Sequence, residues 1–387
     1  MKRIHSIDLL RGVIMIIMAL DHVRDYFHTQ AFFYDPLDLD KTSPALFFTR
    51  WITHFCAPTF MLLTGASAFI VGERKGTKAL SWFLFTRGLF LVIMEHTVLN
   101  FGWYFNIHFH EFAFIVIWSL GVSMIALSAM VYLPKKIILA IGIILVAGHN
   151  ALDGFHVQGQ GAAAFLWSIL HEPNFFQFGS RNIFVGYPLI PWIGTIALGY
   201  SLGSMYASSF DPARRKKLLL SIGCGALLLF AILRSGNFYG DSTPWSKQSS
   251  ILYSFFSFIK VMKYPPSLLY LLATLGPSLI FLYFCEEKEI GRLGKTISVY
   301  GRVPMFYYII HIYLIHLAAL IATNFCPGFS PSNMIWQSWG GNLQGYGFSL
   351  GVVYLVWISL ILVLYLPCRW YDRYKQAHKE KKWLSYL

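Results

Sequence analysis

The sequence predicts an all-α polytopic membrane protein of about ten transmembrane helices, and its composition is the first support for this fold class. Of the 387 residues, 56% are hydrophobic and only 13% are charged, whereas soluble domains contain about 45–50% apolar and about 25% charged residues. An aromatic content of 18% excludes a disordered chain. The apolar residues come in runs of roughly 17–25, the length of a membrane-spanning helix, without the alternation over about ten residues that is typical of a membrane β-barrel.

Ten apolar runs are candidate spans, because each is long enough for a helix to cross the hydrocarbon core. They cover residues 9–27, 51–72, 83–100, 112–133, 136–152, 183–206, 217–234, 265–285, 301–323 and 346–367. Two further segments, 161–170 and 250–262, are amphipathic or short and are expected to lie at the membrane interface. We find no internal repeat and no large soluble segment, so we expect a single domain over residues 1–387.

The distribution of basic residues predicts that both termini face the cytoplasm. The formal net charge is +13, and Lys and Arg beside membrane spans mark the cytoplasmic side. With a cytoplasmic N-terminus, 20 of the 31 basic residues lie in cytoplasmic segments and 8 in outer segments or outer span ends, while Arg11, Arg87 and Arg302 lie within spans near the inner face. This one-sided pattern indicates a lipid bilayer as the partner of the positive charge, and we expect no nucleic-acid partner.

The first span, in the sequence SIDLLRGVIMIIMALDHVRDYFH, carries the clearest functional pattern. Arg11 and His22 are 11 residues apart, which places them on one helix face about three turns, or roughly 16 Å, from each other. Asp8 precedes Arg11 by three residues and Asp25 follows His22 by three, so both lie near this face. Ionisable groups in a span are costly and usually face a protein or water-filled interior. The alternative is that Asp8–Arg11 and Asp21–Arg24 are helix-end ion pairs beside a buried, hydrogen-bonded His22.

Four segments resemble the heparan-α-glucosaminide N-acetyltransferase family and its bacterial relatives. They are SIDLLRG in the first span, RWITHFCAP at Arg50–Pro58 with Gly65, YPLIPWIGTIALGYSLG at Tyr187–Gly203, and GRVPMFYYIIHIYLIH at Gly301–His316. The Arg11-x10-His22 spacing also resembles that of membrane O-acyltransferases that modify bacterial polysaccharides. Both resemblances imply a transmembrane acyltransferase-like bundle that uses acetyl-CoA from the cytoplasm and delivers the acetyl group across a membrane, here a bacterial inner membrane.

The two resemblances differ on the catalytic histidine. In the heparan enzymes the reactive His lies in the loop after this helix, which His28 matches, and their usual helix Asn is His22 here. We favour His22, since its geometry with Arg11 follows from the helical repeat, and keep His28 as the alternative. An imidazole has a pKa suited to acid–base or nucleophilic work, and Asp25 or Asp21 would fix its tautomer.

Cations near the inner face are candidates for the phosphates of coenzyme A. Arg11, with Asp8 beside it, is the first candidate, and Arg87 and Arg302 are the next, each near the start of a span that runs outward. Ordinary positive-inside anchoring is the alternative for Arg87 and Arg302. The chain contains no GxxxxGK[ST] motif, so ATP hydrolysis is not indicated.

Polar residues in the outer halves of other spans are candidates for the acceptor site. Arg50 and His54 are one turn apart, Glu95 is a carboxylate within the third span, and His311 lies at mid-depth as a pocket residue. Aromatic residues of the outer loops are interpreted as an interfacial belt, with sugar stacking as the alternative; they include Trp103, Tyr104, Trp336 and Trp339.

The histidine and cysteine patterns do not predict a metal site. The run His108-x-His110-Glu111 matches no strong ligand spacing, and His149, Asn150 and Asp153 at the end of the fifth span are expected to cap it or face the acceptor. The five Cys are scattered, mostly in apolar runs and without a CxxC pair, so we interpret them as small core residues.

These observations predict an acetyl-CoA-dependent acetyltransferase that acts on an amino or hydroxyl group of a sugar or glycan. The competing hypothesis is a proton-coupled transporter or exporter of a small anion or a lipid-linked sugar, in which the His and Asp groups of the first span relay protons. The acceptor, the choice between N- and O-acetylation, and the oligomeric state, for which a homodimer is one option, are left open by the sequence.

Overall fold

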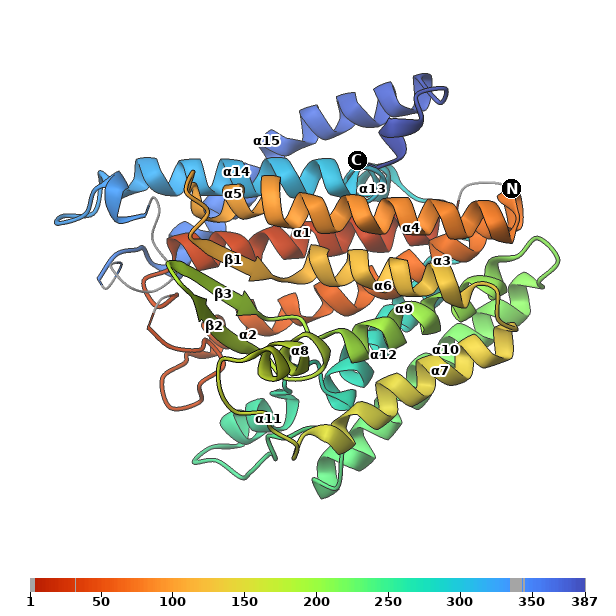
Figure 1. The fold of residues 1–387 in the computed structure, drawn as a ribbon, viewed down its shortest axis with the longest axis horizontal. Coiled ribbons are helices and arrows are strands. Elements are labelled where there is room, and N and C mark those ends of the chain that lie inside the picture. Colours follow the sequence, from red (N-terminus) through yellow and green to blue (C-terminus); the bar gives the residue numbers. More distant parts are fainter. Residues whose placement is uncertain (1–3, 32, 335–342, 344, 387) are drawn as a thin grey trace. The chain divides into compact units, whose positions relative to one another are not determined.

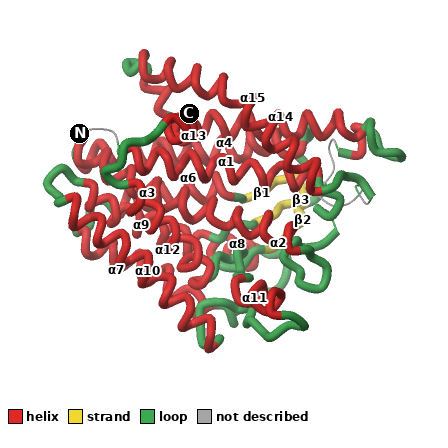
Figure 2. The backbone as a smooth tube through the Cα atoms, turned by 180° about the vertical axis from the view of Figure 1, so that it is seen from behind, coloured by secondary structure: helices red, strands yellow, loops and turns green. Residues whose placement is uncertain are grey.

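A computed structural model describes residues 4–31, 33–334, 343 and 345–386, and it is about 70% helical. Helices dominate the chain trace, and short strands are the exception (Figure 2). This confirms the all-α polytopic membrane fold. Trp336 and Trp339 lie outside the described residues.

Seven helical segments of the described residues are long and apolar enough to cross a membrane. They are Pro44–Lys75, Thr77–Tyr104, Lys135–Leu152, Pro212–Gly236, Leu268–Cys285, Pro304–Thr323 and Leu350–Ala377. The other three predicted spans are also helical, as α1 (His5–Phe27), α6 (Val116–Met130) and α9 (Leu189–Gly203). The helix α1 carries several charged residues, and α6 and α9 have only 15 residues each, which explains why composition and length alone do not select them.

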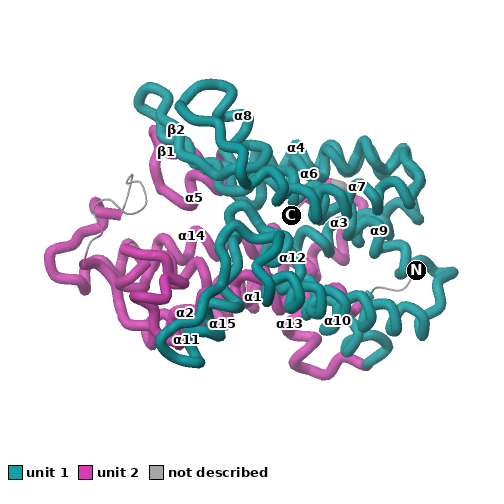
Figure 3. The backbone as a smooth tube through the Cα atoms, turned by 90° about the horizontal axis from the view of Figure 1, so that it is seen from below, with its two compact units in different colours: residues 1–4, 57–96, 113–288 teal, residues 5–56, 97–112, 289–387 magenta. Residues whose placement is uncertain are grey.

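The chain divides into two compact units (Figure 3). Unit 1 contains residues 1–4, 57–96 and 113–288, and unit 2 contains residues 5–56, 97–112 and 289–387. The single domain expected over residues 1–387 stays a prediction.

Unit 1 is built mainly from antiparallel helix pairs. Its helices are α3 (Cys56–Lys75, all but its first residue), α4 (Thr77–Met94), α6, α7 (Lys135–Gly148), η3 (His149–Leu152), α8 (Ala162–Leu170), α9, η4 (Ser204–Tyr206), α10 (Pro212–Gly236), α11 (Ile251–Ile259) and α12 (Leu268–Cys285). The helices α4 and α6 pack together, as do α7 with α9 and α10 with α12. A Cβ on Gly88 would lie 2.5 Å from the Gly121 carbonyl oxygen, so only glycine permits this close approach of α4 and α6.

A three-stranded sheet was not predicted from the sequence. Its strands are β1 (Glu111–Phe114), β2 (Asn174–Phe178) and β3 (Arg181–Val185), in the order β1-β3-β2, and β2 pairs antiparallel with β3 from Asn174 opposite Val185 to Phe178 opposite Arg181. The predicted span 183–206 is therefore too long at its start, because residues 183–185 complete β3 and the helix begins only after Pro188. The short amphipathic segments do form helices, α8 and α11.

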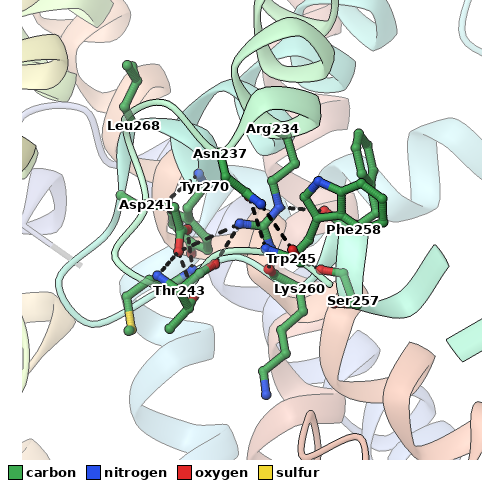
Figure 4. A network of polar contacts seen from close by, with 12 residues as sticks. Arg234, Asn237, Asp241, Thr243, Trp245, Ser257, Phe258, Lys260, Leu268 and Tyr270 are labelled. Atoms are coloured by element: carbon green, nitrogen blue, oxygen red, sulfur yellow. Dashed lines mark hydrogen bonds and ion pairs between the residues drawn. The ribbon is translucent and has the colours of Figure 1, made fainter. Parts of the chain in front are cut away.

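The segment after α10 is organised by one buried cation (Figure 4). Arg234 is 2% exposed and donates to the carbonyl oxygens of Thr243 at 2.7 Å, of Ser257 and Phe258 at 2.9 Å, and of Lys260. A guanidinium presents several donors in a fixed geometry, so this one side chain stabilises the irregular loop through hydrogen bonds to its backbone carbonyls.

Unit 2 is formed by elements from both ends of the chain. They are α1, α2 (Pro44–Trp51), η1 (Ile52–Phe55), α5 (Asn100–Tyr104), α13 (Arg292–Arg302), α14 (Pro304–Thr323), η5 (Pro331–Asn333), α15 (Leu350–Ala377) and η6 (Lys382–Ser385). The π-helical turn η2 (Glu95–Leu99) and strand β1 cross the boundary between the units. The helix α15 exceeds the predicted span 346–367 because it continues through Pro367.

Helix directions within unit 2 agree with the predicted alternation of the spans. The start of α1 lies beside Gly301 and its end beside α14, so α1 and α14 run in the same direction (Figure 1). The helix α15 runs the opposite way, because Phe348 pairs with His28 while Trp357 donates to the Ile16 carbonyl at 2.9 Å. These directions are those of a first, a ninth and a tenth span.

A glycine contact fixes how α1 crosses α13. A Cβ on Gly301 would lie 2.1 Å from the Asp8 carbonyl oxygen, and a Cβ on Gly12 would lie 2.2 Å from that of Ile297. Both positions exclude any larger side chain without a backbone shift. The crossing places the N-terminal residues of α1 against the junction of α13 and α14.

Candidate functional site

Two histidines from helices at opposite ends of the chain meet in unit 2. His22 lies in the last turns of α1 and His311 in α14, and their Nδ1 and Nε2 atoms are 2.7 Å apart. The two rings are stacked at 5.0 Å with an interplanar angle of 20°. His311 is fully buried, at 0% exposure. The sequence predicts both residues as site residues, and the structure brings them into direct contact.

The hydrogen bonds of His311 define which nitrogen of each ring carries a proton. The Nδ1 atom of His311 lies 3.0 Å from the Tyr307 carbonyl oxygen, and a carbonyl only accepts, so Nδ1–H donates. An uncompensated charge is costly in a fully buried position, so we assign His311 as neutral, with a lone pair on Nε2. His22 then donates its Nδ1–H to that lone pair, and the Nε2 atom of a neutral His22 is the basic nitrogen.

Aromatic rings enclose the histidine pair. The Trp103 ring contacts His22 edge-on at 4.9 Å, and Tyr308 does so at 5.9 Å. Tyr307 stacks on His311 at 5.1 Å, and Tyr26 donates to the Trp103 carbonyl oxygen at 2.6 Å. Trp103 is only 6% exposed, so it belongs to this enclosure and the interpretation of it as a belt residue is wrong.

Two carboxylates and two guanidinium groups form a network at the C-terminal end of α1. Arg24 donates to Asp21 at 2.9 Å and to Asp25 at 2.5 Å, and Arg50 of α2 donates to Asp21 at 2.6 Å. The Arg24 side chain is 4% exposed. The network balances two positive with two negative charges, and it contains the Asp21–Arg24 ion pair of the alternative interpretation of the first span. The role of Asp21 or Asp25 in orienting His22 stays a prediction.

His28 follows α1 and has a different environment from His22. Its backbone forms a bridge with Phe348, and its Nδ1 atom accepts a hydrogen bond from the Gln30 N–H at 3.3 Å. Burial, and then the charge of Arg24, lower the pKa of His28 below its ordinary value of 6.5. In this tautomer the lone pair of His28 is already engaged by a backbone donor.

The residues predicted to bind the donor lie together at the opposite end of α1. Arg11 donates to the Gly301 carbonyl oxygen at 3.2 Å and lies 3.8 Å from Asp8. Arg302, the next residue along, pairs with Asp372 of α15 at 2.7 Å. The structure therefore gathers three of the four predicted donor-binding residues at the crossing of α1 with the α13–α14 junction.

The remaining predicted residues have separate surroundings. Arg87 lies on α4 of unit 1 over the Phe83 ring at 5.7 Å. Glu95, also in unit 1, is 1% exposed and accepts hydrogen bonds from the Ile117 and Trp118 N–H groups at 2.9 Å each, which caps α6. His54 lies buried in η1 of unit 2. Their roles in binding substrates stay predictions.

Sequence reasoning did not assign Tyr26, Tyr308 or Trp103 to the histidine pair. Spacing along α1 does place Tyr26 one turn from His22, and Tyr308 precedes His311 by three residues on α14. Trp103 is brought to His22 by α5, a short helix that no hydrophobic run distinguishes. The available signal was the location of aromatic residues next to ionisable ones in otherwise apolar segments.

The fold and this site define a polytopic membrane protein with a polar, histidine-containing centre enclosed by helices. Comparison with known families is more specific: the catalytic-domain model of heparan-alpha-glucosaminide N-acetyltransferase matches residues 3–233, more than half of the chain. The chain belongs to this family of membrane acetyltransferases. No curated protein shows a significant sequence match. The matched range includes His22 and ends before His311.

Proposed function

We propose that this protein transfers an acetyl group from cytoplasmic acetyl-CoA, through a site at His22, to an amino or hydroxyl group of a sugar or glycan on the far side of a bacterial inner membrane. The family supports the acetyl transfer. The single observation that supports the position of the chemistry is the 2.7 Å contact between His22 Nδ1 and His311 Nε2, because it leaves the basic lone pair on His22 Nε2.

The donor binds at the inner end of α1 in this proposal. Arg11 and Arg302 supply guanidinium groups that match phosphate oxygens, and Asp8 and Asp372 hold them in place through the contacts described above. The distance of roughly 16 Å along α1 between Arg11 and His22 suits an extended ligand with an anionic head and a reactive thioester at its far end. Arg87 is a further donor contact that the sequence proposes.

His22 Nε2 then acts in one of two ways, as a base or as a nucleophile. As a base, it takes the proton of the acceptor while the acceptor attacks the thioester carbonyl carbon, the C–S bond breaks and the proton passes to the CoA thiolate. As a nucleophile, Nε2 itself attacks that carbon and CoA leaves as thiolate; in a second step the acceptor takes the acetyl group as the C–N bond breaks, and the acceptor proton passes to the released Nε2. In both routes His311 fixes the tautomer and orientation of His22.

The acceptor approaches from the outer end of α1. Arg50 and the Asp21–Arg24–Asp25 network lie at this end, and charged groups of this kind hydrogen-bond hydroxyl and amino groups of sugars. His54 and Glu95 are the other acceptor contacts proposed from the sequence.

The test uses the full-length protein in detergent with labelled acetyl-CoA, with and without glucosamine as acceptor. Wild type is compared with His22→Ala and with His28→Ala, its matched control on the same segment. We expect His22→Ala to lose about 10²–10⁴-fold in kcat and His28→Ala to retain activity within tenfold. An acid-quenched sample without acceptor shows whether label stays on the protein, which separates the two routes.

Two results would overturn parts of this proposal. A wild-type protein that neither binds nor turns over acetyl-CoA, yet moves a small anion or protons when reconstituted in vesicles, would be a transporter. An active His22→Ala with an inactive His28→Ala would keep the acetyltransferase and transfer the catalytic role to His28.

A further inference from the structure

A second histidine cluster lies in unit 1, outside the proposed acetyl-transfer site. His149 begins η3 after α7, Asp153 follows η3, and His171 follows α8. One ligand atom of each residue lies within 4.8 Å of those of the other two. The closest pair is His171 Nε2 with Asp153 Oδ1 at 3.1 Å. In a tetrahedral zinc site with bonds of about 2.0–2.1 Å, neighbouring ligand atoms are about 3.3 Å apart.

The two imidazoles are buried and have nitrogens available for a ligand. His149 and His171 are each 2% exposed. Among the described residues, three ring nitrogens make no hydrogen bond of good geometry: Nδ1 and Nε2 of His149, and Nδ1 of His171. The Pro266 carbonyl does lie near the His149 ring. Buried polar atoms in proteins are nearly always hydrogen-bonded, so these nitrogens are available to a ligand that accepts lone pairs.

The carboxylate of the cluster is oriented as a metal ligand usually is. Asn150 donates to Asp153 Oδ2 at 2.9 Å, and its own Oδ1 accepts from the Leu268 N–H at 2.9 Å. The amide thereby anchors one carboxylate oxygen to the start of α12 and directs the other toward His171. Outer hydrogen bonds of this kind are characteristic of metal sites, where they fix ligand orientation and tune affinity.

The surrounding loop joins the two ends of the cluster. The Trp167 ring of α8 lies 5.3 Å from the His171 ring at a tilt of 51°, and its indole N–H donates to the Phe155 carbonyl oxygen at 3.1 Å. Outside the cluster, His156 lies 2.9 Å from Glu172 in an exposed pair. These contacts join the segment after η3 to α8 and to the residues that follow it, and the three candidate ligands lie in or next to these two parts of the chain.

We propose that His149, Asp153 and His171 bind a divalent transition-metal ion of the Zn²⁺ type. Two neutral imidazoles and one carboxylate are ligands that Zn²⁺ prefers, and three protein ligands leave a fourth position for water. The ion ties the end of α7 to the end of α8. This revises the expectation of no metal site, and it is independent of the function proposed above.

The test measures metal bound to the purified full-length protein after chelation and removal of the chelator. Samples are re-equilibrated with Zn²⁺, and with Co²⁺ as a spectroscopic probe, and metal content is determined by mass spectrometry. We expect about one ion per wild-type chain and a visible Co²⁺ absorption spectrum. The loss of bound metal in His149→Gln and His171→Gln is expected to exceed tenfold, whereas His156→Gln, the exposed histidine on the same loop, binds as wild type does.

The possible outcomes decide the proposal without requiring every variant to fold. Asp153→Asn keeps the shape of the side chain and is expected to weaken binding and shift the Co²⁺ spectrum, so it serves if a histidine variant unfolds. A wild-type protein that binds no ion overturns the proposal. So does binding that persists in His149→Gln, His171→Gln and Asp153→Asn, because the ion would then lie elsewhere.

Discussion

The two histidine clusters, His22–His311 in unit 2 and His149–His171 in unit 1, have opposite hydrogen-bond arrangements. His311 uses Nδ1 to donate to the Tyr307 carbonyl and Nε2 to accept from His22, so one partner determines the tautomer of the other. His149 and the Nδ1 atom of His171 have no such hydrogen bonds among the described residues, and a carboxylate lies 3.1 Å from His171 Nε2. A histidine pair whose protons are assigned is suited to moving a proton, whereas one with available lone pairs is suited to holding a cation.

The largest effect is expected from removing the Arg24 cation, which lies on α1 next to the His22–His311 cluster. Arg24→Ala is expected to reduce the free energy of unfolding by about 3–5 kcal/mol, because Asp21 and Asp25 lose the buried cation that they share. Thermal and denaturant unfolding in detergent measure the effect. Arg181→Ala, at an exposed position in β3, is the control and should change stability by less than about 0.5 kcal/mol. Equal effects of the two variants would show that the network around Asp21 contributes little.

The second experiment tests whether His311 determines the chemistry of His22. His311→Ala removes the acceptor for His22 Nδ1–H, and we expect kcat for acetyl transfer to fall by about 10²-fold with little change in KM, since only the orientation and tautomer of the reacting base are affected. His311→Gln supplies an amide oxygen as acceptor and should restore part of the loss. A large rise in KM with unchanged kcat would instead assign His311 to substrate binding.

The third experiment sharpens the description of the second cluster. Asn150→Ala removes the amide that holds Asp153 Oδ2, and we expect the affinity for Zn²⁺ to fall about 10–100-fold, as is usual when such an outer contact of a metal ligand is lost. Competition with a fluorescent chelator measures the affinity. Acetyl transfer at a temperature well below unfolding provides a parallel readout, and a loss confined to that activity would contradict the assignment of Asn150 to a metal site.

The smallest expected effect concerns His28 and the pH dependence of stability. Its pKa in the folded protein is below 6.5, so below about pH 6.5 the unfolded chain binds a proton that the folded protein does not. The stability that neutral His28 provides is therefore complete above pH 6.5 and is lost as the pH falls toward the folded pKa, with a slope of at most about 1.4 kcal/mol per pH unit. In His28→Asn, the free energy of unfolding should depend less on pH between pH 6.5 and 5 than it does in the wild type. An unchanged slope would place the linked proton on another group.

The fold class was predictable because lipid-facing helices require long apolar runs, and all ten predicted runs contain a helix. The helical repeat of α1 also correctly placed Arg11 near the Asp8 carboxylate, and the alternative interpretation of this helix correctly paired Asp21 with Arg24. The sheet was not predicted, because β2 and β3 are five residues each and a third strand joins them from a distant segment.

Tertiary contacts account for what spacing arguments did not find. A repeat of 3.6 residues identifies neighbours on one helix, so Asp25 or Asp21 was the expected partner for His22, whereas His311 is 289 residues away. The same limit hid the second cluster, since His171 is separated from His149 by a loop and by α8. In both clusters the residue types were visible in the sequence, and the pairings were not.

The contact between Gly12 and Gly301 has a mechanical consequence. The backbones of α1 and α13 touch there without room for a methyl group, so an alanine at either position would push the two helices apart. Arg11 lies on one helix beside this contact and Arg302 lies on the other. A substitution at Gly12 or Gly301 would therefore change the separation of the two guanidinium groups without altering either arginine.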